Sequence, residues 1–374
     1  MIARMVGLSR LPRVVLMCGL LAAAGLRAQT PPAETPVSID DNGVTTLHAY
    51  ANLIQMPVLV LSAGRMTVPV IKAERFSLSI DNGPRYQPTH VRPEGADPIS
   101  LTIVLDFAGQ AAELMPKIAE AVDHLTAQGL TPRDHVSLMV MQCTLSDVIE
   151  DAPAVPGLLQ PKIAEAVKAW AARDRTKPCV EDTHLWDALA MAMMRLSDLP
   201  GRRVIVAVTD GDDRGSGHTA MQLAMEMQTY AVTTFGIRPA TTEQTMTALV
   251  GTTIMTVPSS LTQMTTQHPL QAVSELSGGL TLQADRLNAG KQFARIPELV
   301  RGRYILEFPR PSNATEGGHK FDVKVAKSDD FIRASGVTFP LEDPGIAADP
   351  ATLPSDPTLT PQMGKTPVKP PPPR

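Results

Sequence analysis

The chain has 374 residues, of which 43% are apolar and 19% charged, enough apolar material for one or two globular cores. Its formal net charge is −4, and residues 1–28 hold four arginines and no acidic residue, so removing those four positive charges leaves −8. An acidic chain with 4% aromatic residues argues against a nucleic-acid binder, because binding phosphates needs basic surface and stacking on bases needs aromatic rings.

Residues 1–28 have the pattern of a secretory signal peptide. A basic start with Arg4, Arg10 and Arg13 precedes the apolar run Val14 to Gly25, and Leu26-Arg27-Ala28 supplies a cleavage site. An uncleaved membrane anchor is the alternative. We expect an exported chain, periplasmic or extracellular, whose mature part spans no membrane.

Two cysteines, Cys143 and Cys179, remain after cleavage. Export favours a disulfide bond between them, and two buried free thiols are the alternative.

A polar, Pro-rich linker at residues 29–45 leads into an N-terminal β segment at 46–98. Within that segment the β-branched run Thr67 to Ile71 and the alternating run Phe76 to Ile80 predict strands. Asp81-Asn82-Gly83-Pro84 follows as a turn signal.

Strand and helix patterns alternate over residues 99–290. This alternation predicts an α/β fold with a doubly wound, mostly parallel sheet. The expected strands are 101–105, 136–141, 204–208, 232–237 and 280–282, and the expected helices cover 114–125, 161–170, 185–196, 223–227 and 270–276.

A C-terminal β segment is expected at residues 291–340, with strands at 304–308 and 321–325 and a third at 337–339. Because neither β segment has enough strands alone, we expect the two to pair into a small β-sandwich-like module. The α/β domain would then be an insertion between its halves. Residues 341–374 are rich in proline and predict a disordered tail.

Polar residues follow the buried strands at the edge where ligands bind in open α/β sheets. Asp106 directly follows the first of these strands, and Asp210 lies in the stretch Thr209-Asp210-Gly211-Asp212-Asp213 after another. Thr183 precedes a helix containing Asp187-Ala188-Leu189.

Taken in this order, these motifs resemble a von Willebrand factor A (VWA) domain over about residues 99–285. With the signal peptide and the flanking β segments, the layout resembles the secreted VWFA-related family of Acidobacteria. That resemblance implies a metal-ion-dependent adhesion site, in which an Asp-x-Ser-x-Ser stretch, a Thr and a second Asp offer oxygen ligands to Mg²⁺ or another divalent ion.

In this sequence Asp106, Thr183 and Asp210 match that site. Ala108 and Gln110 stand where the family has serines, so the implied site is degenerate. Gln110 and Asp212 are weaker candidate ligands. In the alternative, Asp106 accepts hydrogen bonds from its own turn and Thr183 caps its helix.

These observations predict a non-catalytic protein that binds an unknown protein ligand through this edge of the sheet. The Thr- and Met-rich stretch 239–269 is either a partner-binding loop at the same edge or a disordered insertion. The alternative function is a structural or assembly role carried by the β module. An unrecognised hydrolase is the remaining alternative. The sequence argues against it, because the common nucleophile and phosphate-binding motifs are absent.

Overall fold

The computed structural model describes the residues 50–51, 53–65, 67–174, 176, 184–240, 245–250, 253–258, 268–311, 319–334, 352–353 and 360–364. Residues 1–48 form a unit of their own that lies outside these ranges, and everything below concerns the second unit. No helix within the described ranges has the length and apolar character needed to cross a membrane.

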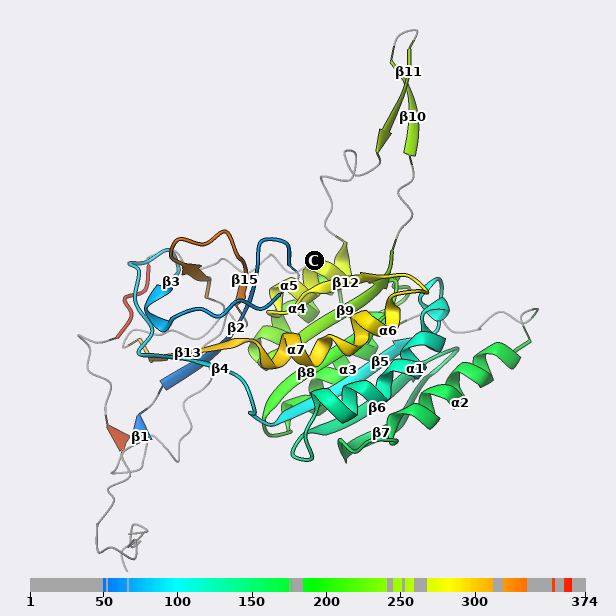
Figure 1. Ribbon diagram of the computed structural model, residues 1–374, viewed down its shortest axis with the longest axis horizontal. Coiled ribbons are helices and arrows are strands. Elements are labelled where there is room, and N and C mark those ends of the chain that lie inside the picture. The colour runs from blue at the N-terminus through cyan, green and yellow to red at the C-terminus, as the bar shows by residue number, and fades with distance from the viewer. Residues whose placement is uncertain are drawn as a thin grey trace, which may run out of the picture. The chain divides into compact units, whose positions relative to one another are not determined.

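Six of the described strands form the main sheet, in the order β12-β9-β8-β5-β6-β7 (Figure 1). Their bounds are β5 Ile99–Asp106, β6 His135–Met141, β7 Leu145–Pro153, β8 Arg202–Val208, β9 Val232–Pro239 and β12 Thr281–Ala284. All neighbours pair in parallel except β6 and β7. The sheet is thus a doubly wound order with one antiparallel edge strand.

Helices cover both faces of this sheet. Those on one face are α1 Met115–His124, α2 Leu159–Ala172, α6 Ala289–Ala294 and α7 Ile296–Arg301, and those on the other are α3 Leu185–Ser197, α4 Ala220–Thr229 and α5 Pro269–Leu276. Short helical turns lie at Ala73–Arg75, Ala111–Glu113 and Leu125–Gly129.

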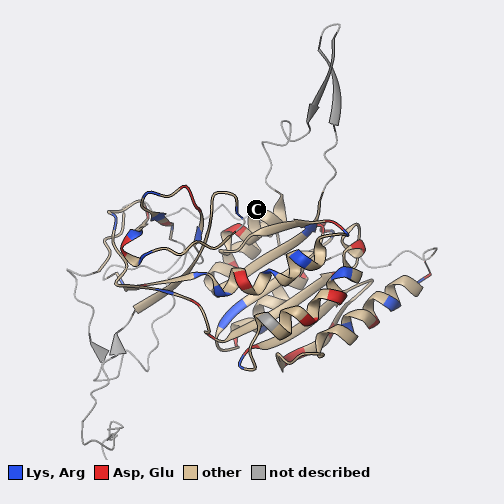
Figure 2. Ribbon diagram, in the orientation of Figure 1, with Lys and Arg blue, Asp and Glu red and all other residues tan. Residues whose placement is uncertain are grey.

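Alternate residues of a strand serve the two faces, so Leu101, Ile103 and Leu105 of β5 pack against the first group of helices and Val104 against the second. Figure 2 shows most charged residues on helices and loops, whereas the central strands are nearly free of charge apart from the start of β8. The predicted fold class is therefore confirmed.

The two flanking segments form antiparallel sheets with each other. A four-stranded sheet has the order β15-β2-β13-β4, and β14 pairs with β3. The bounds are β2 Leu53–Leu61, β3 Phe76–Ile80, β4 His90–Pro93, β13 Tyr304–Pro309, β14 Phe321–Val325 and β15 Phe331–Ala334. Strands from before and after the α/β domain thus build one β module, as the sequence predicted.

Strand β2 joins the module to the α/β domain because its two faces serve different cores. Ile54, Met56, Val58 and Val60 pack inside the module, whereas Leu59 and Leu61 belong to the core of the α/β domain.

Two sequence expectations differ from the structure, and a third is not tested by it. The strand predicted at Thr67 to Ile71 is wrong, since Val70 is 99% exposed and Tyr304 Oη accepts a hydrogen bond from the Ile71 N–H, which leaves no strand partner there. Part of the predicted disordered tail is ordered: β16 Thr352–Leu353 pairs with β1 Tyr50–Ala51, and residues 360–364 lie against β3. The third strand predicted at 337–339 lies outside the described residues.

The Thr- and Met-rich stretch contains a β-hairpin. Strands β10 Thr245–Val250 and β11 Thr253–Pro258 pair antiparallel with each other, and within the described residues they pair with no other strand. The sequence predicts no strands in this stretch, because its threonine-rich composition carries no clear alternation of apolar and polar residues.

Candidate functional site

Asp106 lies at the carboxyl end of β5 and is 0% exposed. Each of its carboxylate oxygens accepts a hydrogen bond, Oδ1 from the Ala108 N–H at 2.8 Å and Oδ2 from Thr209 Oγ1 at 2.7 Å. Burial raises the pKa of Asp106 to about 6 against the lowering effect of these two hydrogen bonds. Asp106 therefore joins the ends of two neighbouring strands from inside the protein.

Asp210 joins the two loops that follow the same strands, β5 and β8. Its Oδ2 accepts a hydrogen bond from the Gln110 N–H at 3.0 Å, and its Oδ1 accepts one from the Asp212 N–H at 3.2 Å. Gly109 lets the loops approach this closely, because it has a φ of +53° and a Cβ there would lie 1.9 Å from Asp210 Oδ2.

The start of α3 is held to the loop after β8 by two further carboxylates. Asp213 Oδ1 accepts hydrogen bonds from the Trp186 N–H at 3.1 Å and from Ser216 Oγ at 2.5 Å. Asp187 accepts hydrogen bonds from the Gly217 N–H at 2.9 Å and the His218 N–H at 3.0 Å, and pairs with His218 Nδ1 at 2.6 Å. Burial acts to raise the pKa of Asp187, but these hydrogen bonds hold it below its usual value.

His268 completes the edge from the start of α5. Its ring packs on Gly211, where a Cβ would lie 2.3 Å from the ring Cε1. Burial lowers the pKa of this imidazole, and the nearby cation of Arg238 lowers it further. A neutral ring at this place fills the space between α5 and the loop after β8.

We call the loops at 107–110, 209–218 and the start of α3, together with His268, the rim. The structure brings the predicted residues Asp106, Gln110, Asp210 and Asp212 together there, with Gln110 acting through its backbone N–H. Sequence reasoning missed the roles of Asp187, Asp213, Ser216, His218 and His268. The clustering of short polar residues between β8 and α4 was the available signal for a loop rich in side chain–backbone hydrogen bonds.

Thr183 and Cys179 lie outside the described residues. Cys143 is disulfide-bonded. Its pairing with Cys179 stays a prediction.

The described part of the rim offers a divalent cation few free ligand positions. Mg²⁺ needs near-octahedral oxygen ligands, each oxygen of Asp106 and Asp210 already accepts one hydrogen bond from the protein, and Ala108 has no ligand atom. Nor do the described residues contain a group of three or more His, Cys, Asp or Glu side chains placed to hold a metal.

The polar residues beside α3 do not form a nucleophile–base pair either. Ser216 Oγ donates to Asp213, whereas His218 is directed at Asp187, with Glu226 3.8 Å from its second ring nitrogen. An activated serine needs the base within hydrogen-bond reach of its hydroxyl.

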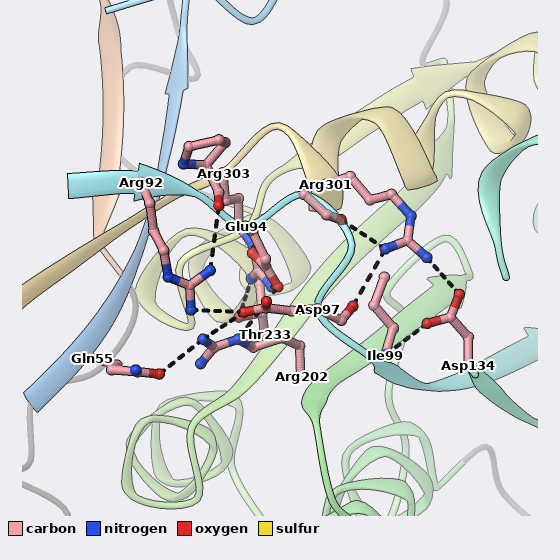
Figure 3. A network of polar contacts seen from close by, with 12 residues as sticks. Gln55, Arg92, Glu94, Asp97, Ile99, Asp134, Arg202, Thr233, Arg301 and Arg303 are labelled. Carbon is pink, nitrogen blue, oxygen red and sulfur yellow. Dashed lines mark hydrogen bonds and ion pairs between the residues drawn. The ribbon is translucent and has the colours of Figure 1, made fainter. Parts of the chain in front are cut away.

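A second polar network lies at the opposite, amino-terminal end of the sheet, where the chain enters and leaves the α/β domain (Figure 3). Arg303 and Glu94 are each 1% exposed and form two hydrogen bonds of 2.7 and 2.8 Å, while a third from Arg303 Nη1 reaches Thr233 Oγ1 at 2.7 Å. Around this pair, Arg202 contacts Asp97 at 3.0 Å, and Arg301 contacts Asp134 at 2.5 Å. We call this set the junction network, because it joins the β module to the α/β domain.

No protein-family model and no curated protein matches the chain. Several solved structures do. They include an aerotolerance-related membrane protein from Bacteroides fragilis NCTC 9343, with 12% identity, coverage of 54% of this chain and 98% of that chain, and a TM-score of 0.35. The conserved hypothetical protein BatB from Bacteroides thetaiotaomicron matches with 13% identity, the same coverages and a TM-score of 0.35.

The vWF domain of the type V pili tip protein Mfa5 from Porphyromonas gingivalis also matches, with 9% identity, coverage of 54% and 95%, and a TM-score of 0.34. The fold and rim define a doubly wound α/β protein with one antiparallel edge strand. This doubly wound, mostly parallel sheet is the fold class that the sequence predicts.

Proposed function

We propose that this protein is a non-catalytic, metal-independent protein-binding protein of the cell envelope or exterior, and that its rim is the binding surface. The observation that carries the proposal is the use of the rim carboxylates. Asp106, Asp210, Asp213 and Asp187 each accept hydrogen bonds from a neighbouring loop. These contacts fix the loop backbones before any partner arrives.

A fixed surface suits protein binding, because little conformational entropy is lost when the partner docks. Gln110, Asp212 and Arg214 are exposed on this surface and are available for contact. Export of the chain by its N-terminal segment would place the rim in the periplasm or outside the cell, where the partner would be an envelope or extracellular protein.

The second candidate is a structural or assembly role in which the β module makes the contacts and the rim is inert. The junction network favours it, because a buried Arg303–Glu94 pair holds the module firmly to the α/β domain. Both candidates predict a partner, but at opposite ends of the main sheet.

A photo-crosslinking amino acid at single positions separates the two. Gln110 and Arg214 place it on the rim, and Arg133, equally exposed before β6, is the matched control at the opposite end of the sheet. Irradiation of cells exporting each variant should give a discrete covalent adduct from the rim positions and none from position 133. Lys324, exposed on β14, probes the module in the same way, and adducts from position 324 alone would favour the second candidate. Identical, diffuse adducts from positions 110, 214 and 133 would contradict binding at the rim.

A further inference from the structure

The C-terminal segment 360–364 lies along one edge of β3 in the β module. Met363 forms a parallel bridge with Ile80, and the Gly364 N–H donates to the Ile80 carbonyl at 3.0 Å. Thr360 is 7% exposed, and Met363 packs against the core of the module. The other edge of β3 is taken by β14, and on the segment's own edge Leu78 pairs with Tyr86, so the segment extends this edge at Ile80.

The seat for this segment is a tight turn that the protein holds in shape by itself. Asp81 and Asn82 have φ of +52° and +58°, and the Gly83 N–H donates to the Ile80 carbonyl at 2.9 Å. Asp81 is 3% exposed, and its carboxylate accepts hydrogen bonds from His319 Nδ1 at 2.7 Å and the Lys320 N–H at 2.8 Å. These contacts involve no residue of the segment.

Glycine is required on both sides of the contact. A Cβ at Gly364 would lie 1.8 Å from the Asp81 carbonyl oxygen, and a Cβ at Gly83 would lie 2.6 Å from the Gln362 carbonyl oxygen. A backbone atom cannot move aside as a flexible side chain can. The seat therefore selects a peptide with glycine directly after the residue that bridges to Ile80.

The backbone pairing between segment and seat is short. Among the described residues it consists of one bridge and one backbone hydrogen bond, beside the buried Thr360 and Pro361 and the half-buried Met363, whereas β14 pairs with β3 over five residues on the other edge. A contact of this size holds the segment mainly because the chain tethers it nearby, which raises its effective concentration.

We propose that the edge of β3 with the Asp81–Gly83 turn is a peptide-binding site, which the chain's own residues 360–364 occupy and can vacate. Its ligand class is an extended protein segment that pairs with β3 at Ile80 and carries the pattern Pro-x-Met-Gly found at 361–364. This site lies on the β module and is separate from the rim.

The test uses the full chain and a fluorescent synthetic peptide with the sequence of residues 357–367. Gly364→Val in the chain should release the tethered segment without touching the seat. Gln362→Ala, at an exposed side chain, is the matched control that keeps the segment in place. Fluorescence anisotropy measures peptide binding to each chain, and circular dichroism checks folding.

We expect the peptide to bind Gly364→Val at least tenfold more tightly than the wild-type chain or Gln362→Ala. A peptide carrying the same Gly364→Val change should bind none of them. Equal binding to wild type and Gly364→Val would overturn the proposal, and so would no binding to a folded Gly364→Val chain. Loss of folding in Gly364→Val would also overturn it, because the segment would then be a fixed part of the module.

Discussion

The Arg303–Glu94 pair is the buried centre of the junction network, and Glu94→Gln tests how much it contributes to holding the β module on the α/β domain. The substitution keeps one acceptor oxygen but removes the carboxylate charge opposite Arg303, whose guanidinium is 1% exposed and also donates to Thr233 Oγ1. Breaking one partner of a buried pair costs about 3–5 kcal/mol, because a charge is left without compensation. At about 2–4 °C per kcal/mol, the thermal midpoint should fall by roughly 6–20 °C.

Urea unfolding at pH 7 gives the free energy directly, and two further variants calibrate it. Asp322→Asn breaks the Arg85–Asp322 pair, whose side chains are 34% and 42% exposed, and should cost less than about 1 kcal/mol. Replacing both Glu94 and Arg303 by methionine should cost less than Glu94→Gln alone, since no charge stays buried. A loss below about 1 kcal/mol for Glu94→Gln would refute the assignment of the pair as the lock of the junction.

Three other predictions concern the rim and the hairpin. The pKa of Asp106 is about 6 in the folded protein, above its ordinary value of 3.8. Between these two pH values the folded state binds more protons than the unfolded state, so the destabilisation that Asp106 causes decreases as the pH falls. The free energy of unfolding of the wild type, minus that of Asp106→Asn, should therefore rise by about 1.4 kcal/mol when the pH is lowered from 7.5 to 5. A difference that does not change with pH would contradict the burial argument. Gly109→Ala should destabilise the protein more than Gly157→Ala. Gly157 has a φ of +79° and open space around it, so Gly157→Ala should cost about 1–2 kcal/mol. Equal losses of the free energy of unfolding in urea would mean that Asp210 does not pack on Gly109. Replacing β10 and β11 by a Gly-Ser linker should shift the thermal midpoint by less than about 2 °C, because the hairpin pairs with no other described strand, and a larger fall would show that it supports the domain.

The main sheet could be predicted because its strands are continuous apolar runs separated by helices with one apolar face. The strand β7, with the sequence LSDVIEDAP, could not, because an edge strand exposed on one side lacks such a run. The second half of β2, Val58 to Leu61, carries no polar alternation, since both of its faces are buried, one in each core.

The polar sites were predicted only in part. Asp106 and Asp210 follow apolar strands, so their place at one edge of the sheet could be inferred from the strand ends. Glu94 and Arg303 are 209 residues apart, and each lies in a short charged stretch typical of a solvated linker. Only the pairing of the two flanking segments brings them together and buries them.

The central claim is that the rim carboxylates hold loops together and do not ligate a metal ion. Isothermal titration calorimetry of the purified mature chain with Mg²⁺, Mn²⁺ and Ca²⁺ tests this most directly, with Asp210→Ala as the control. The account predicts no saturable heat at millimolar metal for either protein. Saturable binding by the wild type that is lost in Asp210→Ala would contradict it and show that the rim is a metal site despite Ala108 and Gln110.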